Sequence, residues 1–201
     1  TTVRRVIQRE HDGVRWELQP DFAPLLDELL KAPGETVKES LVKRVTRHQL
    51  GATTFFIKRY FHHAVPLRPL KFFFKSTQAR QEWDLARQLE ARRIPIVRHV
   101  ALGERWTWHG VRESILVTEG FDGAPLSPGM DVDLSAVLEL VRQMHEQGVL
   151  QEDLHPGNLL VKENPFELRL VDLHGTLVRE KLGAEERRKN LALLRVYLPV
   201  R

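Results

Sequence analysis

The sequence predicts an α+β fold in which an antiparallel sheet with a helix comes first and a smaller, helical part follows. Three observations favour this fold. Residues 53–60 (Thr-Thr-Phe-Phe-Ile-Lys-Arg-Tyr) are β-branched and aromatic, as is typical of strands. Residues 77–92 and 134–147 carry apolar stripes at helical spacing. Two short apolar runs, 159–161 and 168–171, predict a hairpin of two strands joined by a turn.

The helices can be assigned from their apolar faces and caps. Ser76 or Thr77 can cap a helix that runs to about residue 92, where Ile94-Pro95 ends it. Gly148 ends the helix over 134–147 as a C-cap. Residues 22–31 predict a short helix and residues 184–197 a last one. The side chains expected to face inward are Leu25, Leu26, Leu29 and Leu30 in the first helix, and Val137, Leu138, Val141 and Met144 in the helix over 134–147.

The other strands belong to the N-terminal part. A hairpin is expected around His11-Asp12-Gly13, and residues 114–118 (Ser-Ile-Leu-Val-Thr) indicate a buried strand. Residues 48–51 are expected to form a turn. The expected strands are 3–7, 14–18, 36–45, 53–60, 98–106 and 114–118.

Composition narrows the function classes. A chain of 201 residues is long enough for one domain with a sizeable core. The absence of cysteine excludes disulfides and thiol chemistry, and no apolar run approaches the roughly 18 residues that span a bilayer. The net charge of +4 is mild, and no nucleic-acid-binding motif accompanies it. Because the chain starts at Thr1 without a methionine and stops at Arg201, we expect a fragment or a trimmed chain.

The most informative stretch surrounds the C-terminal hairpin. Asp153 and Asn158 lie on a loop, since Pro156 and Gly157 forbid a regular helix, and the loop enters the strand at 159–161. The strand at 168–171 ends in Asp172. This arrangement suits phosphoryl transfer: Asp153 would accept a proton from an attacking hydroxyl, and Asn158 and Asp172 would hold Mg²⁺. The alternative is that Asp and Asn are ordinary turn formers.

The order and spacing of these residues resemble the protein-kinase-like superfamily, whose pattern is H-R-D-L-x-x-x-x-N followed by D-F-G. Asp153 matches the catalytic Asp, Asn158 the metal-binding Asn and Asp172 the Asp of D-F-G. Gln151-Glu152 stands in place of His-Arg, and Leu173-His174 in place of Phe-Gly. Since a Glu in place of that Arg would repel phosphate, control by loop phosphorylation is not expected.

The resemblance implies a small two-lobed fold, with an N-terminal lobe over 1–118 and the hinge and C-terminal lobe over 119–201. It also implies a lysine on a strand and a glutamate on the following helix. Lys58 would position the nucleotide phosphates, and Glu82, on the apolar face of its helix, would pair with it. The alternatives are a solvated strand end and a boundary position beside Trp83.

The nucleotide pocket follows from the same resemblance. Thr118 would be the gatekeeper, and the backbone carbonyl of Glu119 and the amide of Phe121 would bind adenine. Kinases cover the phosphates with a glycine-rich loop. The candidate here is residues 33–40, with a single glycine, in which Val37 to Ser40 would cover the phosphates. An ordinary strand connection is the alternative.

The whole is most similar to the lipopolysaccharide kinase family, a small bacterial group containing 3-deoxy-D-manno-octulosonic acid (Kdo) kinase and the heptose kinases. The residues that carry the resemblance are 57–60, 76–83, 114–119, 153–160 and 171–174. Glu119 and Asp153 are only 34 positions apart in the sequence, which leaves room for one helix. This spacing disfavours the aminoglycoside phosphotransferases, which carry a long insertion there. The Asp-Leu-His-Pro-Gly-Asn form looks closer to the Kdo kinases.

The resemblance implies an ATP- and Mg²⁺-dependent kinase that phosphorylates a sugar hydroxyl, of Kdo or heptose, in the lipopolysaccharide inner core. Its place would be cytoplasmic, peripheral at the inner face of the cytoplasmic membrane. The alternatives are a small-molecule (aminoglycoside-type) or protein phosphotransferase on the same fold, and a nucleotide-binding pseudokinase.

Residues 61–75 mix basic and aromatic side chains, with Arg68, Lys71 and Lys75 around Phe72 to Phe74. Such a segment can dock on an anionic lipid surface. The alternative is that the phenylalanines pack under the helix while the basic side chains are solvated. None of the nine histidines suggests a metal site, because none shows ligand spacing.

Overall fold

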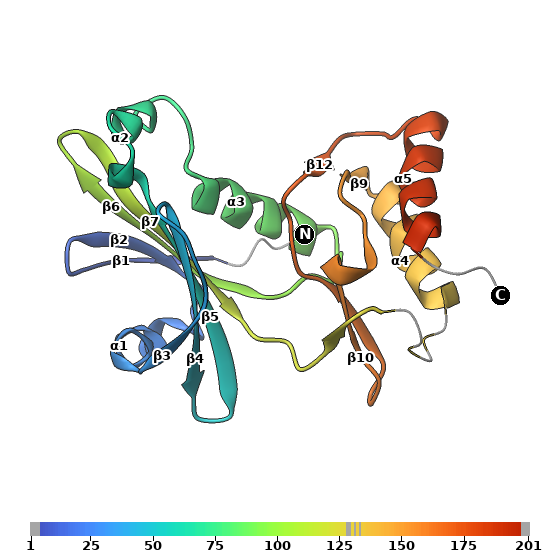
Figure 1. The fold of residues 1–201 in the computed structure, drawn as a ribbon, viewed down its shortest axis with the longest axis horizontal. Helices are drawn as coiled ribbons and strands as arrows, with labels where there is room; N and C mark the ends of the chain where they lie inside the picture. The colour runs from blue at the N-terminus through green and yellow to red at the C-terminus, as the bar shows by residue number, and fades with distance from the viewer. Residues whose placement is uncertain (1–4, 128–129, 131, 133, 198–201) are drawn as a thin grey trace. The chain divides into compact units, whose positions relative to one another are not determined.

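We describe a computed structural model in which residues 5–127, 130, 132 and 134–197 are placed (Figure 1). The contacts divide the chain into two compact units. The first unit contains residues 1–85 and 98–120, and the second contains residues 86–97 and 121–201. The boundary expected after residue 118 stays a prediction.

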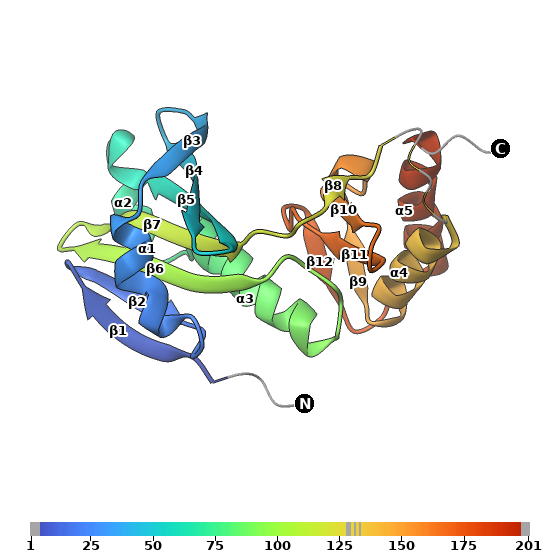
Figure 2. The ribbon, with the colours of Figure 1, turned by 90° about the horizontal axis from the view of Figure 1, so that it is seen from below.

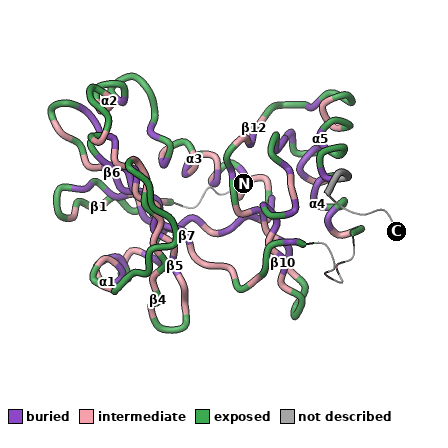
Figure 3. The backbone as a smooth tube through the Cα atoms, in the orientation of Figure 1, coloured by how far each residue is buried: buried purple, intermediate pink, exposed green. Residues whose placement is uncertain are grey.

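The first unit is a seven-stranded antiparallel sheet with strand order β1-β2-β6-β7-β5-β4-β3. Buried positions concentrate in the strands β6 and β7 (Figure 3). The strands are β1 (Ile7–His11), β2 (Val14–Leu18), β3 (Gly34–Glu39), β4 (Lys43–Leu50), β5 (Thr53–Phe61), β6 (His99–Thr107) and β7 (Gly110–Glu119).

Both faces of this sheet are covered, because successive side chains of a strand point to opposite faces. Ile115 and Val117 of β7 join the core that contains Leu26 and Leu29 of helix α1 (Leu26–Lys31). Leu116, between them, joins the second core with Trp83 of helix α3 (Gln78–Ala91). The helices α1 and α3 therefore cover opposite faces (Figure 2), which explains the continuous apolar run in β7.

Four expectations for the first unit need correction. The single strand expected over 36–45 is two antiparallel strands, β3 and β4, because the chain turns at residues 40–42. The first strand is β1, whereas residues 3 and 4 of the strand expected over 3–7 lie outside the described residues. The expected turn at 48–51 is shorter, because β4 continues to Leu50 opposite Thr53 and only Gly51 and Ala52 turn, Gly51 with φ of +59°. Leu25 is exposed, since it ends a 3₁₀ turn (Ala23–Leu25) that precedes α1.

The segment between β5 and α3 contains two short elements that the sequence did not predict. A 3₁₀ turn (His62–Ala64) is followed by helix α2 (Arg68–Lys71). Phe72 is buried with its ring 4.3 Å from the His62 ring, whereas Phe73 and Phe74 are exposed. The segment therefore matches neither alternative completely, because one phenylalanine packs inside and two do not.

The second unit contains two helices, α4 (Leu134–Glu146) and α5 (Ala184–Tyr197), close to the predicted ranges. Leu138 is exposed, contrary to expectation, whereas Val137, Val141 and Met144 are buried. Gly148 has φ of +72° and ends α4 as predicted. The short strands are β8 (Ala124–Pro125), β9 (Val149–Gln151), β10 (Leu159–Lys162), β11 (Glu167–Leu170) and β12 (Thr176–Val178).

These strands form two small sheets, β11-β10-β8 and β12-β9. Leu159 pairs with Leu170 in the β10–β11 hairpin, as the two apolar runs predicted. The N–H of Val97 donates to the carbonyl of Leu170, which attaches residues 94–97 to this hairpin. In the described part of the chain, no helix is long and apolar enough to cross a membrane.

Candidate functional site

Lys58 and Glu82 form the ion pair that the sequence predicted. Lys58 lies in the middle of β5, on the face that α3 covers, and Glu82 lies in the second turn of α3. The Nζ of Lys58 is 2.7 Å from Oε1 of Glu82, and both side chains are largely buried. A carboxylate at the Glu82 position would be costly to bury alone, and Lys58 compensates its charge.

His99 at the start of β6 is a third member of this cluster, which was not predicted from the sequence. Its Nε2 lies 3.4 Å from the same Oε1 of Glu82, and the imidazole is buried. Burial alone would raise the pKa of Glu82. The hydrogen bond from His99 and the charge of Lys58 outweigh burial and lower this pKa to about 2.

This low pKa predicts how stability depends on pH. A carboxyl whose pKa is lower in the folded state stabilises the fold above its ordinary value of 4.5, and loses this contribution as the pH falls towards 2. In Glu82→Gln this contribution is absent. The gap in free energy of unfolding between wild type and variant should narrow by about 2 kcal/mol from pH 7 to pH 3.

Urea titrations at both pH values would measure this gap. Glu28→Gln, a change at an exposed carboxylate of α1, is the control and should show a constant gap. A constant gap for Glu82→Gln as well would contradict the role of the ion pair in stability.

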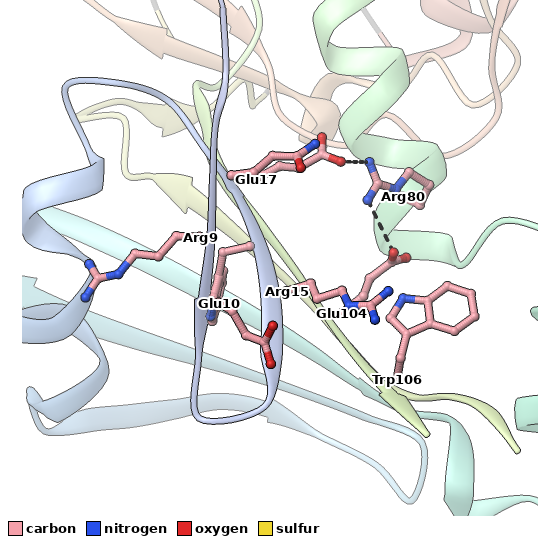
Figure 4. Close-up of a pocket in the computed structure, with 9 residues that line it drawn as sticks. Arg9, Glu10, Arg15, Glu17, Arg80, Glu104 and Trp106 are labelled. Carbon is pink, nitrogen blue, oxygen red and sulfur yellow. Dashed lines mark hydrogen bonds and ion pairs between the residues drawn. The ribbon is translucent and has the colours of Figure 1, made fainter. Parts of the chain in front are cut away.

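Helix α3 is attached to the sheet by polar contacts at its first turns. The Oγ1 of Thr77 caps the helix by accepting the Arg80 N–H at 3.1 Å, as predicted for this position. The guanidinium of Arg80 donates to Glu17 of β2 at 2.6 Å and to Glu104 of β6 at 3.2 Å (Figure 4). The indole of Trp83 also donates to Glu17, at 3.1 Å. These contacts hold Glu82 in place opposite Lys58.

The residues expected at the hinge end β7 and begin the second unit. Thr118 is buried, and the carboxylate of Glu119 accepts from Arg98 at 2.9 Å. The N–H of Gly120 donates to the carbonyl of Thr54. Phe121 belongs to the second unit, where Arg169 lies over its ring at 4.5 Å. Adenine binding by the Glu119 carbonyl and the Phe121 amide stays a prediction.

The candidate phosphate-covering segment lies at the edge of the first unit. Val37 and Lys38 are exposed in β3, and the hairpin turns after Ser40, whose N–H donates to the carbonyl of Lys43 at 2.7 Å. The turn therefore lies at residues 40–42, and only Ser40 of the expected range belongs to it. Its contact with phosphates stays a prediction.

The second unit brings the loop residues Asp153, Asn158 and Asp172 to one end of the β10–β11 hairpin. A 3₁₀ turn (Pro156–Asn158) leads into β10, and the side-chain amide of Asn158 donates to the carbonyl of Asp153 at 3.0 Å. The N–H of Val171 donates to the carbonyl of Asn158, and Asp172 follows at once. The Asp153 carboxylate is 66% exposed, with the imidazole of His155 at 3.7 Å.

Asn158 and Asp172 fit a magnesium ion by their chemistry. The amide nitrogen of Asn158 is used by the Asp153 carbonyl, so its Oδ1 remains for another partner. One oxygen of Asp172 accepts the His174 N–H at 2.9 Å, which fixes this carboxylate and leaves its second oxygen. Oxygen donors are what Mg²⁺ prefers, together with phosphates and water. The described residues contain no cluster of three or more His, Asp or Glu that could hold a metal alone.

Gln151 connects the two loops, although the sequence analysis noted it only as a departure from the kinase pattern. Its fully buried side chain accepts the Asp153 N–H at 3.1 Å and donates to the Asp172 carbonyl at 2.8 Å. Its own carbonyl accepts from Asn190 of α5, and Asn190 also contacts His145 of α4 at 2.9 Å. A buried polar chain from both helices therefore supports the two loops.

Comparison with known proteins gives one family. The family model described as "Lipopolysaccharide kinase (Kdo/WaaP) family" matches residues 27–126 and 128–199. The lipopolysaccharide core heptose(I) kinase WaaP of Pseudomonas aeruginosa is 28% identical over 141 residues, which are 58% of this chain and 51% of the relative. The chain thus spans about half the length of this curated relative.

One solved structure shows the same fold. A structure described as "WaaP in complex with acyl carrier protein" matches with a TM-score of 0.62 and 22% identity, over 94% of this chain and 79% of that one. A structure described as "Crystal structure of BubR1 kinase domain" matches with a TM-score of 0.48 and 14% identity, over 89% of this chain and 52% of that one. The predicted α+β, protein-kinase-like fold is confirmed. The chain belongs to the lipopolysaccharide kinase (Kdo/WaaP) family.

Proposed function

We propose that the protein is an ATP- and Mg²⁺-dependent kinase that phosphorylates a sugar hydroxyl of the lipopolysaccharide inner core. Two observations, one within each unit, support the proposal. The first unit contains the Lys58–Glu82 ion pair at 2.7 Å. The second contains Asp153, Asn158 and Asp172 at one end of a hairpin. The family match spans both parts.

Each residue has a proposed role that follows from its chemistry. Asp153 accepts the proton of the attacking sugar hydroxyl, because its carboxylate is exposed and its backbone is fixed by Gln151 and Asn158. Lys58 binds nucleotide phosphates and is oriented by Glu82. The backbones of Glu119 and Phe121 bind adenine, and residues 1–118 serve as the nucleotide-binding lobe. Asn158 and Asp172 would hold Mg²⁺, which neutralises phosphate charge when bound.

The curated relative is named a heptose(I) kinase, which makes heptose one acceptor to test and Kdo the other. The decisive experiment measures ADP formation with Mg²⁺ and lipid A–Kdo acceptors, with and without heptose. We expect ADP to form only when acceptor and Mg²⁺ are both present. ATP binding without turnover on either acceptor would indicate a nucleotide-binding module, and turnover on aminoglycosides or proteins would indicate another phosphotransferase.

Gln151 allows a sharper test of how the loops are positioned. Gln151→Ala removes the acceptor of the Asp153 N–H and the donor to the Asp172 carbonyl, and so loosens both loops. A small misplacement of reacting groups can lower the rate by about 10²-fold, so kcat should fall while KM for ATP changes little. Gln151→His, which keeps one donor and one acceptor, should restore part of kcat.

Steady-state kinetics below the melting temperature of each variant would measure these effects. Gln143→Ala, which removes an exposed amide of α4, is the matched control. If Gln151→Ala lowered the melting temperature and left kcat unchanged, Gln151 would be purely structural.

We propose a cytoplasmic location at the inner face of the cytoplasmic membrane, because an inner-core acceptor is anchored there by its lipid. The contact would be peripheral.

A further inference from the structure

Two segments of the first unit contain basic and aromatic residues and no acidic ones. Residues 62–80 contain Arg68, Lys71, Lys75 and Arg80 and no Asp or Glu. Residues 105–112, around the turn between β6 and β7, contain two arginines and also lack acidic residues. A surface built from both segments would therefore be cationic.

The first segment exposes large apolar side chains. Phe74 is 92% exposed and Leu67 is 78% exposed. Leu67 also has φ of +59°, a left-handed conformation that is unfavourable for a leucine and occurs mostly where function or packing requires it. Phe72 is buried against His62 and attaches the segment to the sheet. Exposed side chains on an anchored segment indicate an interaction surface rather than part of the core.

The β6–β7 turn extends this surface. Trp108 at its tip is 84% exposed, and Trp106 is partly exposed with its ring 6.1 Å from that of Phe73. A cavity of about 360 Å³ is lined by residues of both segments, including Phe73 and Trp106. Gly110 lies against the carbonyl of Pro69 so closely that a Cβ atom would collide with it. The helix α2 therefore lies beside the end of the β6–β7 hairpin (Figure 1).

The basic side chains of this surface are available. In the described part of the chain, no carboxylate lies within ion-pair distance of Arg68, Lys71 or Lys75. Two acidic residues of the adjoining strands β6 and β7 are buried and paired within the first unit. Glu104 pairs with Arg80, and Glu113 pairs with Arg59.

We propose that this aromatic-basic surface docks the protein on an anionic lipid bilayer. The surface consists of Leu67, Arg68, Lys71, Phe73, Phe74, Lys75, Trp106 and Trp108. Tryptophan is enriched at the membrane–water interface, and basic side chains bind anionic head groups. Apolar and electrostatic contacts together give the two signals that peripheral attachment needs. The biological purpose of this docking, which is to bring the kinase to a lipid-anchored acceptor, rests on the proposed function; the docking itself does not.

Flotation with phosphatidylglycerol vesicles and with neutral phosphatidylcholine vesicles tests the charge contribution. The protein should bind the anionic vesicles, and salt should weaken the binding. The combined change Arg68→Gln, Lys71→Gln and Lys75→Gln should weaken binding about 10²-fold. The combined change Lys181→Gln, Arg188→Gln and Lys189→Gln removes the same charge from exposed positions elsewhere and should have little effect. Equal losses in the two triple variants would overturn the proposal.

The apolar contribution has its own test. Phe74→Ser should weaken binding about 10-fold, whereas Phe166→Ser, at an exposed phenylalanine of the second unit, should not. Brominated anionic lipids should quench tryptophan fluorescence, and the combined change Trp106→Phe and Trp108→Phe should remove most of the quenching, because the two other tryptophans, Trp16 and Trp83, are buried. Unquenched fluorescence would overturn the proposal. The proposal would also fail if Phe74→Ser abolished self-association or binding of an acidic protein and left vesicle binding unchanged.

Vesicle binding and ADP formation are independent measurements. If vesicles bind as expected while no acceptor is phosphorylated, the docking surface stands and the proposed function fails. If a delipidated acceptor is phosphorylated while vesicles do not bind, the docking surface fails and the proposed function stands.

Discussion

Replacing Asp153 with alanine should lower kcat about 10²–10⁴-fold and leave ATP binding nearly unchanged, because the lost group acts on the acceptor rather than on the nucleotide. The carboxylate is exposed, and the loop is held by contacts of the Asp153 backbone with Gln151 and Asn158. Truncating the side chain therefore removes the proton acceptor and keeps the loop. Single-turnover kinetics with a lipopolysaccharide acceptor and a nucleotide titration would separate the two effects.

The neighbouring Glu152 offers a matched control for this change. Its side chain is exposed on the same loop, so Glu152→Gln removes one negative charge there without touching the proposed base. Its kcat should remain near that of the wild type. Equal kcat in wild type and Asp153→Ala would remove Asp153 from the role of general base.

The second large effect is expected for Mg²⁺-dependent ATP binding in Asp172→Ala. Loss of a residue that hydrogen-bonds to a metal ligand lowers the affinity for the metal about 10–100-fold, and loss of the ligand itself should lower it at least as much. Asn158→Ala should have a smaller effect, because a carboxylate holds a dication better than a neutral amide does. Titration of ATP binding with Mg²⁺ would rank the two variants.

Asp122→Asn is the control for the metal prediction, since Asp122 is a fully exposed carboxylate elsewhere in the second unit. A Mg²⁺ titration of Asp172→Ala that matched the wild type would show that the metal ligands lie elsewhere. A larger effect for Asn158→Ala than for Asp172→Ala would reverse the proposed ranking.

The parts of the fold that could be predicted from sequence are those with local signals. Helix α4 ends at Gly148, α3 is capped by Thr77, and the β10–β11 hairpin follows two apolar runs. The bounds of the first strand and of the turn after β4 were predicted wrongly, because they depend on the register of strand pairing. Register is set by pairing with a neighbouring strand, as when β4 continues to Leu50 opposite Thr53.

The candidate site divides in the same way. Lys58 and Glu82 could be found because a carboxylate on an apolar helix face needs a partner and the preceding strand offers one. His99 and Gln151 could not be found from the sequence. His99 contacts Glu82, 17 positions away, and Gln151 contacts Asp172, 21 positions away, and only tertiary packing brings these pairs together. The sole signal was a polar residue beside a run of buried apolar ones, such as His99 before Val100 and Ala101.

The double attachment of Arg80 has a consequence for regulation. A kinase that is switched by swinging its glutamate helix must break that helix away from the sheet, and here the movement would separate Arg80 from both Glu17 and Glu104. Depriving one buried charge of its partner costs about 3–5 kcal/mol. We therefore expect no resting form with the helix withdrawn. If the protein is the kinase proposed above, its rate would then follow the supply of ATP and acceptor, as in a housekeeping biosynthetic enzyme rather than a signalling switch.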